Sequence, residues 1–313
     1  MQGLEISKNF YREYGEPMLR EQFPELLDKI AVGLTGSGSE CYGFDDDVSR
    51  DHDFEAGFCI FLPGDDKVDR RCAFLLERAY SKLPKEYAGL KRSVISPVGG
   101  NRHGVIRRED FFTDKVGAAD GKLSDAQWLS IPEYALCEAV NGEVFYDGDG
   151  AFTAIREALG RYPEDIRRKK LAGNLLLMAQ SGQYNYGRCL AHGESGAAQL
   201  AVNAFVESAM SCVFLLNGRY KPYYKWSFRA MRSLELLWQL ADSFEFLLTG
   251  ENTEENAEVK TDVIEDICAL VIGVLKDQGL TDAVCGDLEK HAYSVNDSVG
   301  DAAIRNMHIL AGV

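Results

Sequence analysis

Apolar and polar positions follow two different periods along the chain, and the change of period divides the sequence. In the first half, short apolar runs bounded by turn residues, such as Ile30–Thr35 and Phe54–Leu62, indicate strands between helices. Beyond Tyr162 every apolar stretch has helical spacing. We therefore expect an α+β protein, with a small mixed-sheet α/β domain over residues 1–150 followed by an all-α helical bundle over residues 151–313.

The same periodicity predicts the individual elements. In the first half the expected helices are Leu4–Phe23, Pro24–Leu27, Asp65–Leu83, Pro132–Val140 and Phe152–Leu159, and further short strands are expected around 93–95, 104–106 and 143–147. In the second half the expected helices are Ile166–Ala179, Gly196–Leu216, Trp226–Leu248, Val259–Gln278 and Thr281–Tyr293. Gly196–Leu216 is apolar nearly all round, so it is predicted to be central and buried.

The stretch between the first two predicted strands carries the chemistry. It reads GSGSECYGFDDDVSRDHDF from Gly36 to Phe54. On an extended strand, side chains two residues apart share a face, so Asp51 and Asp53 are expected to lie side by side. Two adjacent carboxylates are costly unless a cation lies between them, and oxygen ligands suit magnesium. The backbone N–H groups and hydroxyls of the preceding loop suit phosphates.

This stretch resembles the signature of the DNA polymerase β-type nucleotidyltransferase superfamily, in which a Gly-Ser pair opens a helix, a glycine follows one turn later, and an acid-any-acid triplet lies on the next strand. The matching residues are Gly38-Ser39, Gly43 and Asp51-His52-Asp53, with a spacing one residue longer than in minimal members. Gly36-Ser37 is a second possible Gly-Ser pair, so the resemblance leaves Ser37 and Ser39 both as candidates for phosphate binding. It implies Mg²⁺ or Mn²⁺ held by Asp51 and Asp53.

Superfamily chemistry of this kind uses a third carboxylate on a neighbouring strand. Glu109 and Asp110 are the acids near the strand predicted around Gly104–Arg108, and Glu109 is the residue that we assign to this role. The alternative is a surface acid paired with Arg107 or Arg108. A missing third acid would weaken the case for catalysis and leave nucleotide binding in place.

Three well-known loop motifs do not fit these residues. A dinucleotide fingerprint would need glycine at Cys41, a Walker A loop would need Gly-Lys-Ser/Thr, and a calcium loop from Asp45 has Arg50 where its turn glycine belongs. A solvated acidic turn without chemistry is the remaining alternative. The isolated histidines are not assigned roles. His52 is expected to be structural or a contact to the loop, and His103, beside Gly104, is in a position to approach the active cleft, although a lone loop histidine is more often solvated.

The stretch Arg219–Trp226 gathers basic and aromatic residues in an otherwise acidic protein. It resembles the Pro-Tyr-x-Lys-Trp segment of antibiotic (kanamycin and lincosamide) nucleotidyltransferase-like bacterial proteins, which have a helical C-terminal domain. The resemblance implies that Lys225 reaches the phosphates of the nucleotide. The alternative is an interhelical loop whose aromatic residues cover the bundle.

Composition and charge limit the kinds of partner that we expect the protein to bind. A net charge of −15 argues against duplex nucleic acid as a partner, because duplex binding depends on Lys and Arg. Eight scattered cysteines form no Cys-x-x-Cys pair. The polar first residues and the absence of a span-length apolar run predict no membrane partner and a cytoplasmic protein. A homodimer through an apolar face of the helical half is a further possibility.

Together these features predict a magnesium-dependent nucleotidyltransferase. The resemblance implies transfer of a nucleoside monophosphate, AMP from ATP or the equivalent from another NTP, to a hydroxyl of a small molecule or protein. The alternative is a non-catalytic nucleotide-binding or interaction protein that retains the fold.

Overall fold

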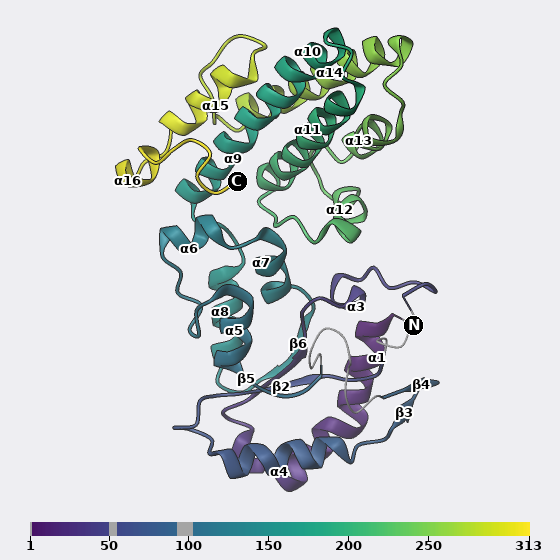
Figure 1. Cartoon of the computed structure of the whole chain (residues 1–313). Coiled ribbons are helices and arrows are strands. Elements are labelled where there is room, and N and C mark those ends of the chain that lie inside the picture. The colour runs from purple at the N-terminus through teal and green to yellow at the C-terminus, as the bar shows by residue number, and fades with distance from the viewer. Residues whose placement is uncertain (1, 50–54, 93–102) are drawn as a thin grey trace. The chain divides into compact units, whose positions relative to one another are not determined.

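The computed structural model describes residues 2–49, 55–92 and 103–313, which form two compact units (Figure 1). The described residues up to Leu123, together with Pro132–Gly160, form the first unit. Ser124–Ile131 and Arg161–Val313 form the second. The chain is a mixed α/β protein in which a small mixed sheet is accompanied by many helices.

The first unit is built on a sheet in the order β5-β2-β1-β6. Its strands are β1 (Ala31–Leu34), β2 (Cys59–Leu62), β5 (Gly104–Arg107) and β6 (Glu143–Asp147). β1 runs antiparallel to β2 and β6, and β2 runs parallel to β5. In register, Cys59 lies beside Gly33 and Gly104, and Leu34 lies beside Glu143. The end of β1 and the starts of β2, β5 and β6 therefore share one end of the sheet, which we call the loop end.

Helices cover both faces of this sheet. They are α1 (Gly3–Phe10), a π-helical turn η1 (Tyr11–Gly15), α2 (Glu16–Gln22), the 3₁₀ turn η2 (Pro24–Leu26), α3 (Ser39–Tyr42), α4 (Arg70–Ser81), α5 (Arg108–Val116), α7 (Glu133–Val140) and α8 (Ala151–Leu159), with a small hairpin of β3 (Glu86–Tyr87) and β4 (Leu90–Lys91). Ile60 packs in the core that the N-terminal helices and α4 share. Phe61, on the other face, stacks on Phe152 of α8 with ring centroids 4.0 Å apart.

The first helix is less regular than its pattern predicts. The predicted span Leu4–Phe23 is largely helical, but a π-helical turn interrupts it at Tyr11–Gly15. Pro17 has no N–H to donate to the preceding turn, which explains the interruption. Gly15 also permits close approach, because a Cβ there would meet the ring of Phe58 at 2.9 Å.

Three boundaries differ from the prediction. α4 begins at Arg70 instead of Asp65, because the Asp69 carboxylate accepts the N–H of Cys72 at 2.7 Å and caps the helix there. β2 begins at Cys59, and Phe54 lies outside the described residues, as does the strand predicted at 93–95. The first unit extends to Gly160 because α8 packs on the sheet through Phe152.

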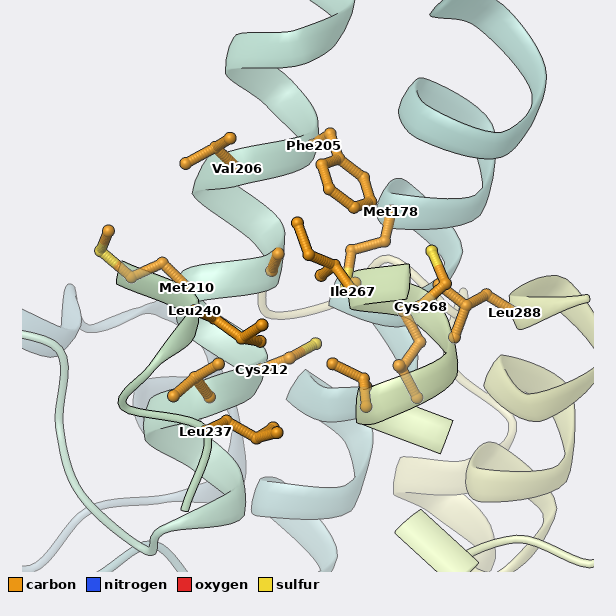
Figure 2. Close-up of a cluster of buried hydrophobic side chains, with 14 of the residues drawn as sticks. Met178, Phe205, Val206, Met210, Cys212, Leu237, Leu240, Ile267, Cys268 and Leu288 are labelled. Carbon is orange, nitrogen blue, oxygen red and sulfur yellow. The ribbon is translucent and has the colours of Figure 1, made fainter. Parts of the chain in front are cut away.

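The second unit is helical. It contains α6 (Asp125–Ser130), α9 (Glu164–Met178), a π-helical segment η3 (Ala179–Tyr186), α10 (Gly187–Ala191), α11 (Ser195–Leu216), α12 (Tyr224–Met231), α13 (Leu240–Thr249), α14 (Glu254–Asp277), α15 (Leu288–Asp297) and α16 (Ala302–Arg305). Figure 2 shows side chains of α11, such as Phe205 and Cys212, meeting Met178 of α9 and Ile267 of α14. In the described ranges α11 is the one helix long and apolar enough to cross a membrane, and it is largely buried in this core, as predicted.

The helix predicted over Trp226–Leu248 is wrong. α12 and α13 are separated by residues 232–239. Leu237 adopts a left-handed backbone conformation with φ of 60°, and its side chain is buried. Asn217 pairs with the backbone of Leu236, accepting its N–H at 2.9 Å and donating to its carbonyl at 3.0 Å. These contacts replace the helical hydrogen bonds that would otherwise continue through this stretch.

A buried lysine fastens the C-terminal residues to α9. Lys169 is fully buried, and its Nζ donates to Asn296 Oδ1 at 2.8 Å and to the carbonyls of Arg305 at 3.2 Å and Met307 at 2.8 Å. Burial lowers the pKa of Lys169. The ammonium thus stabilises this segment through carbonyl and amide oxygens.

We expect Lys169→Met to destabilise the second unit by about 3 kcal/mol, because three buried acceptors lose a charged donor. All three tryptophans (Trp128, Trp226 and Trp238) lie in the second unit, so tryptophan fluorescence during urea unfolding reports on it. Lys290→Met, at an exposed position of α15, is the matched control and should change stability by less than about 0.5 kcal/mol. Equal effects of the two variants would contradict the anchoring role.

Candidate functional site

The glycine and serine residues after β1 form a loop that opens a short helix at the loop end of the sheet. Gly36 has φ of 127°, Gly38 is the N-cap of α3, and α3 begins at Ser39. Gly43 ends this helix in the left-handed conformation, with φ of 68°. The predicted local order, a Gly-Ser pair at a helix start and a glycine one turn later, is therefore observed. Assignment to the superfamily stays a prediction.

Asn141, which directly follows α7, holds the loop in place. Its Oδ1 accepts the N–H of Gly36 at 2.9 Å, and its Nδ2 donates to the carbonyl of Gly36 at 2.7 Å. The Thr35 hydroxyl lies 3.0 Å from the same Oδ1. Arg156 donates to the carbonyl of Asn141 in turn. The Asn141 amide thus pairs with both polar groups of Gly36 and fixes the loop.

Asn141→Ala should destabilise the first unit by about 1–3 kcal/mol, because the N–H and carbonyl of Gly36 lose their partner. Far-UV circular dichroism during urea unfolding measures this change. Asn203→Ala is the matched control: Asn203, on α11, accepts a single exposed hydrogen bond from Gln199. If both variants unfold at the wild-type denaturant concentration, the loop is not held by Asn141.

The two candidate serines have different surroundings. Ser37 is exposed at the loop surface. Ser39 is half-buried, and its hydroxyl lies 3.5 Å from a carboxylate oxygen of the buried Glu40. Because a carboxylate beside Ser39 disfavours a second anion there, the surroundings of Ser37 suit an anion better, and contact of either serine with a phosphate stays a prediction.

A cavity of about 1010 Å³ extends from the loop along β5, between α4 and α5. Thr35, Gly36 and Ser37 line one end, and Asp65 and Glu109 line the other. The cations that line it are paired. Lys115 contacts Glu138 at 2.9 Å, Arg70 contacts Asp65 at 2.7 Å, and Arg107 contacts Asp65 at 2.5 Å. The cavity is large enough for a nucleotide-sized ligand.

Glu109 does not lie on strand β5, where the sequence analysis expected a third carboxylate. It lies in the first turn of α5, where Oε1 accepts the N–H of Gly64 at 3.1 Å. Arg107, the last residue of β5, pairs with Leu62, whereas the loop end lies at Gly104. Arg107 is three residues along β5 from Gly104, which corresponds to about 10 Å. The structure therefore does not bring Glu109 to the Gly-Ser loop. Its Oε2 is buried and has no partner in the described part of the chain.

The other predicted residues are the acidic triplet and Lys225. Asp51, His52 and Asp53 lie outside the described residues. In the described ranges, no group of three or more His, Cys, Asp or Glu side chains could hold a metal ion. Lys225 belongs to the second unit, in the first turn of α12, with its Nζ 5.0 Å from the centre of the Trp226 ring. Its contact with phosphates stays a prediction.

One comparison with known proteins gives a match. Residues 128–227 match the model of a family described as a domain of unknown function (DUF4037). No curated protein and no solved structure matches the chain. The matched segment contains Asn141 and Lys225 and leaves out the Gly-Ser loop that Asn141 holds.

Sequence reasoning missed two features of the loop end. His103 is not solvated as expected: its side chain is buried beside Glu55, which lies two residues beyond Asp53 in the sequence. The alternation of acids at 51, 53 and 55 was the available signal for Glu55. Asn141 gave no signal, because a single asparagine after a helix commonly serves as a turn residue.

Proposed function

We propose that this protein is a magnesium-dependent nucleotidyltransferase that moves a nucleoside monophosphate from an NTP, with ATP as the expected donor, to an acceptor hydroxyl. The observation that carries the proposal is the loop Gly36–Ser39. It opens α3 directly after β1, is fixed by Asn141, and precedes the Asp51-His52-Asp53 triplet in the sequence. A glycine-rich loop with ordered N–H groups suits phosphate oxygens.

Asp51 and Asp53 would hold the ion, because their carboxylates supply the oxygen ligands that magnesium prefers. When bound, the ion neutralises charge on the triphosphate and polarises the α-phosphoryl group. Ser37 and the N–H groups of the loop would contact the β- and γ-phosphates. The cavity along β5 supports the proposal, since it begins at these residues and provides room for the rest of the substrate.

A nucleotide-binding protein without transfer activity is the second candidate, and the position of Glu109 favours it. Two carboxylates near the loop end are engaged with lysines: Glu138 pairs with Lys115, and Glu143 pairs with Lys8.

Calorimetry with ATP and MgCl₂ separates a nucleotide binder from a protein that does not bind. Incubation with ATP labelled at the α-phosphate then separates an enzyme from a binder. The proposal predicts labelled AMP, free or attached to an acceptor, together with pyrophosphate, whereas a contaminating ATPase produces ADP and phosphate. Saturable binding without labelled AMP would favour the second candidate, and absence of binding would reject both.

A further inference from the structure

A buried carboxylate–imidazole pair lies at the loop end of the sheet. His103 directly precedes β5, and Glu55 lies four residues before β2, the neighbouring parallel strand. The Nδ1 of His103 is 3.1 Å from Oε1 of Glu55, and the two side chains are 7% and 15% exposed. A hydrogen bond of this length between buried groups fixes the orientation of the imidazole.

The backbone of Gly57 also packs against the imidazole ring. A Cβ on Gly57 would meet Cγ of His103 at 2.6 Å and its Nδ1 at 2.9 Å. Real Cβ atoms do not approach so closely, and the atoms concerned belong to a rigid ring. The imidazole is thus packed directly on the Gly57 backbone and held in one position.

The second ring nitrogen of His103 has no structural role that the described residues reveal. Its Nε2 is buried and has no hydrogen-bond partner in the described ranges. An unsatisfied buried polar atom costs about 1–3 kcal/mol, so its retention calls for an explanation. A carboxylate that accepts Nδ1–H selects the tautomer in which Nε2 carries a lone pair. The pair therefore offers an oriented proton acceptor.

We propose that His103 is the general base for the acceptor hydroxyl and that Glu55 is its positioning residue. This inference rests on the proposed nucleotidyl transfer. β5 lies two strands from β1, so His103, at the start of β5, is about 10 Å across the sheet from the end of β1, where the Gly-Ser loop begins. Nε2 takes the hydroxyl proton as the acceptor oxygen bonds to the α-phosphorus. The bond from that phosphorus to the bridging oxygen breaks, and pyrophosphate leaves with the electron pair.

The test uses the full chain, ATP labelled at the α-phosphate, MgCl₂, and water as the acceptor. His103→Gln should lower the rate of AMP formation about 10²–10⁴-fold, the usual contribution of a general base. Its Kd for ATP should stay within about twofold of wild type, because a general base for the acceptor contributes little to nucleotide binding.

Imidazole added to His103→Ala should restore activity, which a purely structural role would not allow. Gly57→Ala should also lower the rate by displacing the ring. His192→Gln, at an exposed position of the second unit, is the control and should keep the wild-type rate.

The outcomes separate the two proposals. If His103→Gln binds ATP and forms AMP at the wild-type rate, the base assignment is wrong and nucleotidyl transfer stands. If imidazole fails to restore a folded, ATP-binding His103→Ala protein, the base assignment is also rejected. If the wild-type protein forms no AMP, transfer fails and the assignment fails with it. Nitrogen-15 NMR of histidine gives a readout without activity: Nδ1–H is the expected tautomer for His103, and Glu55→Gln should remove that preference.

Discussion

Replacing Asp51 and Asp53 together by asparagine should lower AMP formation from ATP at least about 10³-fold, because two anionic oxygen ligands for magnesium are lost with little change in side-chain volume. A metal ion contributes several kcal/mol of transition-state stabilisation, and about 4 kcal/mol corresponds to this factor. The rate is measured with α-labelled ATP at saturating MgCl₂. MnCl₂ should recover little activity, since amide oxygens are neutral.

A charge-matched control is available on α14. Asp262→Asn with Asp266→Asn also removes two negative charges from exposed positions one helical turn apart. This variant should keep the wild-type rate, so a general effect of net charge is separated from the loss of metal ligands. Full activity in the Asp51/Asp53 variant would end the proposal that these carboxylates hold a catalytic ion.

Gly142→Ala should destabilise the first unit by at least about 3 kcal/mol, which is no smaller than the effect expected of Lys169→Met or Asn141→Ala. Gly142 has φ of 67°, and a Cβ there would overlap the carbonyl oxygen of Leu34, the last residue of β1. The added Cβ is fixed to the backbone of Gly142, and the carbonyl belongs to the backbone of Leu34. The overlap can therefore be removed only if β1 and β6 move apart. Far-UV circular dichroism should show the loss, while the tryptophan fluorescence transition of the second unit should be unchanged.

Gly117→Ala is the control for conformation alone. Gly117 also has positive φ, 72°, and nothing lies within 4 Å of a Cβ built there. It should cost about 1–2 kcal/mol, the penalty for an L-residue in the left-handed region. If the two alanine variants are equally stable, the close approach of Gly142 to β1 is not important for folding.

Sequence patterns predicted the elements whose stability depends on local burial. The buried strand β1 and the apolar helix α11 lie where their runs of apolar residues placed them. A helix that opens at a Gly-Ser pair was implied by the family resemblance, which left Gly36-Ser37 and Gly38-Ser39 both possible, and the structure begins α3 at Ser39.

Features that depend on distant partners were not predictable in this way. Glu109 was assigned to a strand because periodicity does not show where β5 ends and α5 begins. The burial of His103 depends on Glu55, 48 residues away, and no local pattern encodes that contact. The break between α12 and α13 depends on Asn217, 19 residues before Leu236.

The strand order of the sheet limits where the polypeptide can be cut to give fragments that fold. It also limits how much of the first unit can fold before synthesis has passed β6. The central strand β1 pairs with β6, which lies far along the chain, and Asn141 reaches Gly36 across 105 residues. A nascent chain released before β6 would leave one side of β1 unpaired, with an aggregation-prone strand edge. A fragment cut at the family boundaries 128–227 would contain β6 without its neighbour β1. Recombinant fragments should therefore keep residues 2–160 together.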